Sequence, residues 1–267
     1  MNTIEDCVCF VTGGAGGIGY EIVKKLIEAE AKMVYIGDWN EEKGRVAVVD
    51  LTKDCRYKKA QFINMDVTDA AAFENAIKKI IGQSAQLDLI INNAGVLESD
   101  RTIDVNIKGA YTGSELGMKY LSKGGRIINV SSTWGFYGIG EIPRYVAASH
   151  AIIGMSRSFA GCYWHKQRGI SVLTFCVGPT STDFIANLKN NEKYLSDRER
   201  AVLRFYSQFT LQSPEVVAGN LIRVLNYGEN GQVWVSESCE PLYEIDIPNY
   251  QNWKIKHNYM LFDENFK

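Results

Sequence analysis

The sequence contains little cysteine, histidine or proline, and neither sign of charge is in excess. Its 267 residues include six cysteines, three histidines and five prolines. No Cys-x-x-Cys pair is present, so the sequence favours neither a zinc cluster nor a disulfide frame, and we expect reduced thiols and no metal. No proline- or serine-rich linker divides the chain, which favours a single domain.

The charge balance and the lengths of the apolar runs exclude several classes of partner. Lysine and arginine total 29 against 31 acidic residues, so no global field attracts nucleic acid or anionic lipid. No apolar run reaches the ~18 residues that would span a bilayer, and the acidic start does not resemble a targeting peptide. With 46% hydrophobic residues, we expect a soluble, cytoplasmic protein that acts on a small molecule.

Short β-branched or apolar runs alternate with longer helical patterns. This order predicts an α/β fold, a doubly wound parallel sheet of seven strands with helices on both faces. The predicted strands are Cys7 to Val11, Met33 to Gly37, Gln61 to Met65, Leu87 to Asn92, Arg126 to Ser131, Ile170 to Cys176 and Gln232 to Val235. The predicted helices are Ile18 to Ala29, Ala70 to Ile81, Asn106 to Leu121, Tyr145 to His165 and Pro214 to Asn226.

Two segments depart from this alternation. Residues 183–213 are polar, charged and aromatic, and an insertion of this kind lies beyond the strand ends, where it could act as a lid. Residues 242–267 form a tail rich in aromatic side chains, after a domain that spans 1–241. Several aromatic residues indicate an apolar cavity, although most aromatic residues simply belong to a core: Trp134, Phe136, Phe184, Phe205 and Tyr206.

A glycine-rich turn follows the first predicted strand and opens the first predicted helix. Gly13, Gly17 and Gly19 occupy this turn. Glycine lets the backbone adopt positive φ and approach a pyrophosphate closely, while the N–H groups of the helix start face its negative charge. The turn therefore predicts a dinucleotide site.

Asp38 ends the second predicted strand, 19 residues after Gly19. A carboxylate at this place can accept hydrogen bonds from both hydroxyls of an adenosine ribose, and it repels a 2′-phosphate. No lysine or arginine lies in the glycine turn or at Trp39 and Asn40 to offset that repulsion. The sequence therefore predicts NAD in preference to NADP.

Further motifs follow in order: Asp66-Val67, Asn92-Asn93-Ala94-Gly95, Asn106, and Ser132 placed 13 residues before Tyr145. With the glycine turn they make residues 5–236 resemble the short-chain dehydrogenase/reductase family, which has a Rossmann fold. Short stretches are most similar to the NAD-dependent branch that contains 15-hydroxyprostaglandin dehydrogenases and insect-type alcohol dehydrogenases. The resemblance implies cofactor contacts at Gly13, Gly17, Ile18, Gly19, Asp38, Trp39, Asp66, Val67, Asn93, Ala94, Gly95, Tyr145, Gly178, Thr180 and Thr182. It implies catalytic positions at Asn106, Ser132, Tyr145 and Ser149.

Ser149 departs from the family at a position that matters for the chemistry, because the family has lysine there. By resemblance, Ser132 holds the substrate oxygen, Tyr145 exchanges a proton with it, and the lysine favours tyrosinate and contacts the nicotinamide ribose. An ammonium ~5 Å from the phenol, at an effective dielectric near 20, is worth roughly 3 kcal/mol, or about two pKa units. Carbonyl reduction should suffer less than alcohol oxidation, since reduction needs only a neutral phenol. His150 and Lys108 are conceivable substitute cations, but we expect both to be ordinary helix residues.

Three hypotheses follow. The first is an NAD-dependent oxidoreductase that acts on a small or lipid-like alcohol or ketone, with activity reduced or altered by Ser149. The second is a non-redox isomerase or epimerase that uses the same pocket. The third is a catalytically silent dinucleotide- or ligand-binding protein. The family also implies a homodimer or homotetramer through the helices predicted over 106–121 and 145–165.

Overall fold

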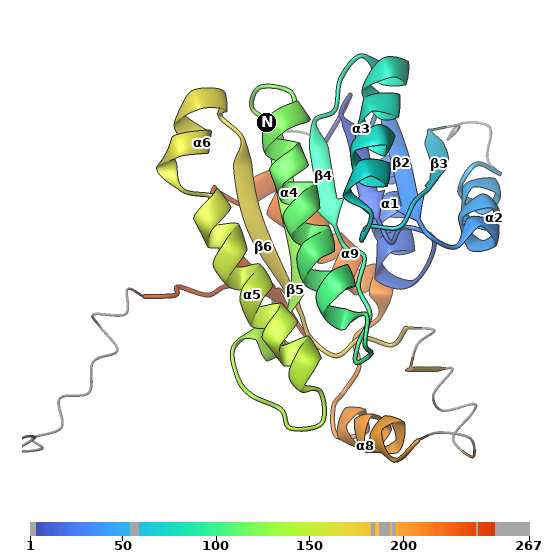
Figure 1. The fold of residues 1–267 in the computed structure, drawn as a ribbon, viewed down its shortest axis with the longest axis vertical. Helices are drawn as coiled ribbons and strands as arrows, with labels where there is room; N and C mark the ends of the chain where they lie inside the picture. Colours follow the sequence, from blue (N-terminus) through green and yellow to red (C-terminus); the bar gives the residue numbers. More distant parts are fainter. Residues whose placement is uncertain are drawn as a thin grey trace, which may run out of the picture.

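The computed structural model describes residues 4–53, 59–182, 185–186, 193, 196–238 and 240–248. One eight-stranded sheet forms its centre, in the order β3-β2-β1-β4-β5-β6-β7-β8 (Figure 1). The strands are β1 Val8–Thr12, β2 Met33–Asp38, β3 Ala60–Asn64, β4 Leu89–Asn92, β5 Arg126–Ser132, β6 Ser171–Val177, β7 Val233–Ser236 and β8 Tyr243–Glu244. β1 pairs in parallel with both β2 and β4, so the strand order reverses there and opens a crevice at the carboxyl ends of the strands.

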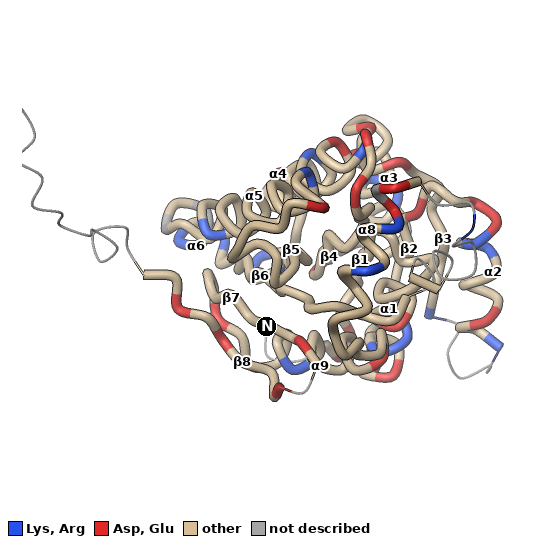
Figure 2. The backbone as a smooth tube through the Cα atoms, turned by 90° about the horizontal axis from the view of Figure 1, so that it is seen from below, with Lys and Arg blue, Asp and Glu red and all other residues tan. Residues whose placement is uncertain are grey.

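Helices cover both faces of the sheet. Figure 2 shows α3, α4 and α5 on one side and α1 and α9 on the other. The helices and helical turns of the described residues are α1 Gly17–Glu28, α2 Glu41–Leu51, α3 Ala70–Ser84, the π-helix η2 Ile103–Lys108, α4 Gly109–Tyr120, the 3-10 turn η3 Thr133–Gly135, α5 Pro143–Phe159, α6 Cys162–Arg168, α8 Asp197–Tyr206 and α9 Pro214–Tyr227. The predicted fold class, a Rossmann fold in one domain, is confirmed.

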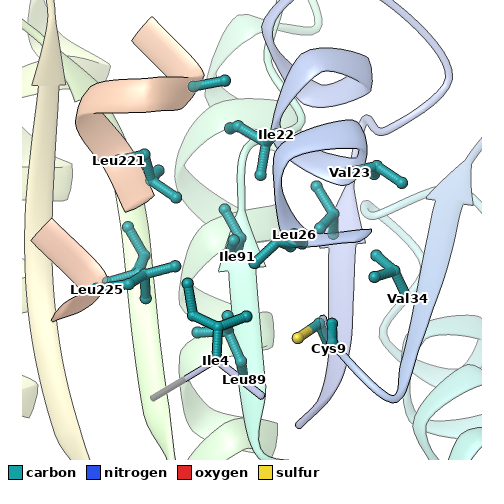
Figure 3. Packing of buried hydrophobic residues seen from close by; sticks show 14 of the residues in the cluster. Ile4, Cys9, Ile22, Val23, Leu26, Val34, Leu89, Ile91, Leu221 and Leu225 are labelled. Atoms are coloured by element: carbon teal, nitrogen blue, oxygen red, sulfur yellow. The ribbon is translucent and has the colours of Figure 1, made fainter. Parts of the chain in front are cut away.

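The core follows from the periodicities in the sequence. In α1, Ile22, Val23 and Leu26 recur at helical spacing and are buried against the sheet. Leu221 and Leu225 of α9 meet the same layer, as Figure 3 shows. The central strands are apolar on both faces, which is the pattern of a parallel sheet covered twice.

The structure corrects three details of the predicted elements. The sheet has an eighth strand, β8, which pairs antiparallel with β7 and is only two residues long, too short for a periodic signal. The helix predicted over 145–165 is instead α5 and α6, because the chain leaves the helix at Gly161, whose extended ψ of 155° starts α6. The helix predicted over 106–121 begins within η2 and continues as α4.

Some predictions fall at the limits of the described chain. Within residues 183–213, α8 is a helix capped by Ser196, while 183–184, 187–192 and 194–195 lie outside the described residues. The tail predicted from 242 joins the sheet through β8, and 249–267 lie outside. Cys7, Cys9 and Cys176 are buried; the side chains of the other three cysteines are not among those described. No helix within the described ranges combines the length and apolarity needed to cross a membrane.

Candidate active site

All of the predicted cofactor and catalytic residues line one cavity of about 530 Å³. It runs along the carboxyl edge of the sheet, from the glycine turn after β1 to the first turn of α5. The cavity brings these positions together from eight segments of the chain because parallel strands end at the same edge. Their individual roles stay predictions.

The glycine turn is built too tightly for side chains at two positions. A Cβ atom at Gly19 would lie 2.1 Å from the Gly13 carbonyl oxygen, and one at Gly13 would lie 2.8 Å from Ala94 Cα. Gly13 also has φ of +65°, which favours glycine. α1 starts directly after Gly16, which supplies no side-chain cap, so its first N–H groups can receive an anion. The turn fits a pyrophosphate.

Asp38 is fixed at the end of β2 by two backbone donors. Ala15 N donates to its Oδ2 at 3.2 Å and Asn40 N donates to its Oδ1 at 2.9 Å. Trp39 beside it is 68% exposed and lines the cavity. Lys43, in the first turn of α2, also lines the cavity. Lys43 was missed from the sequence. The helix that carries it, α2, was not predicted, and Lys43 lies beyond the residues next to Asp38 that were expected to face a 2′-phosphate.

Asp66 carries an ion pair at the end of the cavity that lies beside β2 and β3. Arg101 Nη2 lies 2.5 Å from its Oδ2, and Thr68 donates to its Oδ1 through both N–H and hydroxyl. Burial opposes ionisation of Asp66, but the bonds from Thr68 and Arg101 outweigh it and lower the pKa of this carboxyl. Arg101 was missed from the sequence, since nothing local links it to a residue 35 positions earlier.

Two asparagines hold the loops that frame the cavity. Asn93 Nδ2 donates to the carbonyls of Thr12 and Gly13 at 3.1 and 3.2 Å, which ties the loop after β4 to the glycine turn. Asn106, inside η2, accepts from Val96 N and donates to Val96 O, both at 2.9 Å. A π-type turn often marks a functional site. Here it directs the Asn106 amide to the loop that precedes η2.

The loop after β6 closes the cavity over the glycine turn. A Cβ atom at Gly17 would lie 3.7 Å from Thr182 Cγ2. Thr180 is buried and donates to the Gly178 carbonyl at 2.8 Å, which stabilises the turn. Of the three positions predicted here to contact the cofactor, Thr182 lies against Gly17 at the start of α1.

Tyr145 and Ser132 meet at the other end of the cavity. Ser132 is buried at the end of β5 and accepts from Trp134 N at 3.2 Å. Tyr145, in the first turn of α5, lines the same part of the cavity. Desolvation by burial raises the pKa of its phenol, and the interaction with the Ser132 hydroxyl offsets only part of this rise. The pair therefore presents a neutral phenol to the cavity.

Ser149 fills the position one helical turn after Tyr145. Its hydroxyl donates to the Tyr145 carbonyl at 2.8 Å, and its side chain is 3% exposed. The two conceivable substitute cations lie elsewhere. Lys108 pairs with Asp104, and its side chain is exposed. The exposed His150 holds its ring Nδ1 2.9 Å from the Val146 carbonyl of its own helix.

Aromatic rings enclose the cavity beside Tyr145. Trp134, 1% exposed, lies edge-on to Tyr145 with ring centroids 5.8 Å apart. Phe205 and Tyr206 of α8 pack on the same indole at 5.3 and 5.2 Å. Burial raises the pKa of Tyr206 far above its usual range. Of the five aromatic residues singled out in the sequence, Trp134 and Tyr206 line the cavity, Phe136 packs in another cluster, and Phe184 lies outside the described residues.

Charge is distributed unevenly along the cavity. Among the described lining residues, the charged ones are Asp38, Lys43, Asp66 and Arg101. Asp38, Lys43 and Asp66 lie on or just after β2 and β3, and Arg101 is paired with Asp66, so all four charges are at that end of the cavity. The described part of the wall around Tyr145 is uncharged, so this end suits a neutral, largely apolar molecule.

Comparisons with known proteins agree with this geometry. A family model described as short chain dehydrogenase matches residues 7–193. 15-Hydroxyprostaglandin dehydrogenase of Rattus norvegicus, named for NAD(+), is 31% identical over 231 residues, which cover 82% of this chain and 85% of the relative. Alcohol dehydrogenase 2 of Ceratitis rosa is 28% identical over 246 residues, 86% of this chain and 90% of the relative. A solved dehydrogenase/reductase from Sinorhizobium meliloti 1021 aligns with a TM-score of 0.73 at 25% identity, covering 88% of this chain and 95% of that one.

Proposed function

Because the chain belongs to the short-chain dehydrogenase family, we propose that it binds NAD and acts as an oxidoreductase on a small or lipid-like alcohol or ketone. The observation that carries the proposal is that Tyr145 and Ser132 line one end of a cavity whose other end holds the glycine turn and Asp38. A relative whose name specifies NAD(+) supports the cofactor assignment.

The preference for NAD rests on Asp38. Two N–H groups hold its carboxylate at the end of β2, where it would accept from ribose hydroxyls and repel a 2′-phosphate. Lys43 weakens this repulsion, because a second cavity-lining charge of opposite sign lies nearby. We therefore expect a preference for NAD that is smaller than an isolated carboxylate would produce.

The residues at the other end would handle the proton. Ser132 would donate to the carbonyl oxygen of the substrate, and the neutral Tyr145 phenol would give up its proton to the same oxygen. NADH, when bound, would supply the hydride. The Trp134 and Tyr206 rings would exclude water from the reacting carbon. With no ammonium at position 149 to favour tyrosinate, we expect reduction to be faster than oxidation.

The test is a steady-state and single-turnover screen of the protein and its Ser149→Lys variant with NADH, NAD, NADPH and NADP. The substrates include short aliphatic ketones, acetophenone and the matching alcohols. We expect NADH to bind at micromolar levels and a neutral ketone to oxidise it, with a faster reaction in the variant. Absence of NADH binding would exclude the proposed oxidoreductase.

Binding without turnover would favour the two alternatives. Both alternatives are supported by Ser149, because its hydroxyl donates to the Tyr145 carbonyl and brings no positive charge to the phenol. Incubating candidate carbonyl compounds without cofactor then separates an isomerase or epimerase from a silent binding protein. We also propose a cytoplasmic location, which the free thiols of Cys9 and Cys176 support.

A further inference from the structure

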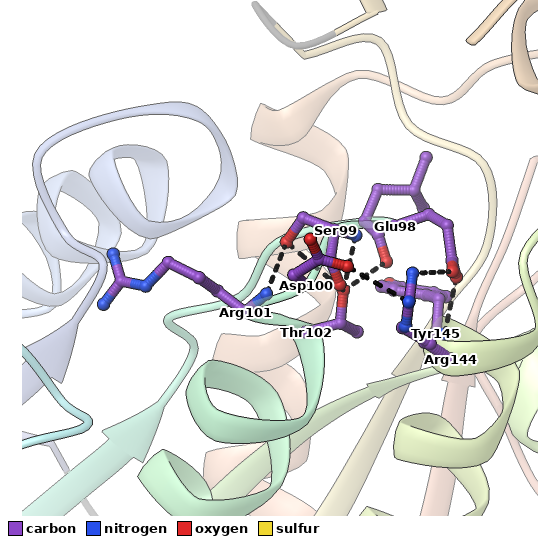
Figure 4. Close-up of polar contacts among 8 residues, drawn as sticks. Glu98, Ser99, Asp100, Arg101, Thr102, Arg144 and Tyr145 are labelled. Atoms are coloured by element: carbon purple, nitrogen blue, oxygen red, sulfur yellow. Dashed lines mark hydrogen bonds and ion pairs between the residues drawn. The ribbon is translucent and has the colours of Figure 1, made fainter. Parts of the chain in front are cut away.

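Glu98 is a buried carboxylate at the start of the helix that carries Tyr145. Its side chain is 2% exposed, and its Oε2 accepts from Tyr145 N at 3.1 Å. Its Oε1 lies 3.4 Å from Arg144 Nη1, and the other guanidinium nitrogen of Arg144 pairs with Asp100 at 3.1 Å. Figure 4 shows these side chains converging from the loop after β4 and from α5. Glu98 is not among the described residues that line the cavity.

The first turn of α5 needs an external acceptor. Ile142 at the N-cap provides no side-chain bond, and Pro143 has no N–H. Val146 N donates to the Ile142 carbonyl. The N–H groups of Arg144 and Tyr145 precede it in the first turn, where a helix offers its donors no acceptor of its own. The Glu98 carboxylate accepts one of them, and its negative charge is favourable at a helix N-terminus.

The same loop is held from two other directions. Asn106 bonds both the N–H and the carbonyl of Val96, two residues before Glu98. Thr102 donates to the Leu97 and Ser99 carbonyls and accepts from Ser99 N, which fixes the turn after Glu98. Side-chain hydrogen bonds on both sides of Glu98 therefore hold the loop from which it contacts Tyr145.

We propose that Glu98 is a positioning residue for Tyr145: a carboxylate from a distant loop that caps the first turn of α5 at the amide of the proton-donating residue itself. The assignment rests on the proposed function for the reaction it serves. Since the capped N–H belongs to Tyr145, a loss of the bond moves the phenol relative to Ser132 but leaves the glycine turn and Asp38, at the other end of the cavity, unchanged. A misplacement of 1 Å in an active site can cost about 100-fold in rate.

The test compares Glu98→Ala, Glu98→Gln and Asp100→Ala in the full-length protein. Glu98→Ala removes the acceptor, Glu98→Gln keeps an acceptor oxygen without the charge, and Asp100→Ala removes the exposed partner of Arg144 but leaves the cap. The readouts are NADH affinity, single-turnover reduction of acetophenone, the exchange rate of the Tyr145 amide, and the ¹³Cζ resonance of Tyr145.

We expect Glu98→Ala to lower single-turnover reduction by about 10- to 100-fold, with NADH affinity within about twofold of the wild type. The Tyr145 amide hydrogen should exchange at least about tenfold faster, because its N–H loses its acceptor and becomes accessible to water. The ¹³Cζ resonance of Tyr145 should shift, because the phenol moves relative to Ser132. Glu98→Gln should recover most of the rate and the protection, and Asp100→Ala should match the wild type.

Wild-type exchange and an unmoved resonance in Glu98→Ala would overturn the proposal, and so would failure of Glu98→Gln to restore protection. If Glu98→Ala does not fold, Glu98→Asp keeps the charge but withdraws it by one methylene, and the same loss of protection is expected. If the wild type leaves acetophenone unreduced, the proposed function fails for this probe, while the amide and the resonance still decide the role of Glu98.

Discussion

Ser149 places a small hydroxyl where an ammonium would face the Tyr145 phenol. Burial already raises the pKa of this phenol, and no cation of the described residues acts against that rise, since Lys108 is paired with Asp104 and the His150 ring is bonded to its own helix. Both effects keep Tyr145 protonated at neutral pH. A protonated phenol is a proton donor and a poor base, so single side chains already bias the expected reaction toward reduction.

The pH profile should show this bias. Alcohol oxidation needs tyrosinate, so its rate in the wild type should rise about tenfold per pH unit with no plateau up to pH 10, while reduction stays flat. Ser149→Lys should lower the pKa of Tyr145 by about two units and raise oxidation at pH 7 by up to about 100-fold. Steady-state rates in both directions between pH 6 and 10 measure this.

Ser149→Ala is the matched control, because it removes the hydroxyl without adding charge. Its profile should follow that of the wild type. An oxidation profile that is the same in Ser149→Lys as in the wild type would show that the phenol does not respond to the cation.

The turn between β1 and α1 is the element on which cofactor binding depends. Gly13 and Gly19 are in contact through their backbones, and Asn93 donates to the Gly13 carbonyl between them. Gly16, in the same turn, has an extended φ of -166° and open space where a Cβ atom would be. One short element therefore contains both a position that excludes a methyl group and one that accepts it.

Gly19→Ala should destabilise the protein by about 1–3 kcal/mol, because the new Cβ overlaps the Gly13 carbonyl oxygen and the backbone must move. NADH binding should be lost with it. Gly16→Ala should change the unfolding free energy by less than about 0.5 kcal/mol. Urea unfolding and NADH titration of both variants test the pair, and equal stabilities would contradict the expectation.

In the whole molecule, α4 and α5 lie side by side on the outside of one layer, as Figures 1 and 2 show. Gly154 on α5 is exposed, and a Cβ atom there would meet nothing within 4 Å. The resemblance described in the sequence analysis implies a homodimer through these two helices. We therefore propose the same surface for the homodimer or homotetramer expected from the sequence.

Gly154→Arg tests this surface, because the arginine is accommodated in one subunit but would clash in a helix bundle between two. We expect light scattering after size exclusion to give a dimer or tetramer for the wild type and a smaller species for the variant. Gly82→Arg on α3 is the control, since it also points into open space but lies away from α5. A monomeric wild type would contradict the proposed interface.

The sequence alone determined the alternation of most strands and helices and many of the residues that meet at the cavity. Gly13 and Asp38 were predictable because each lies at the end of a strand, and parallel strands end at one edge. Ser132 and Tyr145 were predictable from the spacing that resembles the family. β8 and α2 were not predictable from the sequence. β8 is only two residues long, and α2 has only Gly44 and Ala47 buried, so neither shows a periodic apolar pattern.

The tertiary structure decided which distant side chains act on those positions. Glu98 reaches the Tyr145 amide across 47 residues, and Arg101 reaches Asp66 across 35. It also decided that Lys108 and His150 are engaged outside the cavity. Sequence spacing places a residue along an element, but the packing of separate elements sets which neighbour its side chain meets.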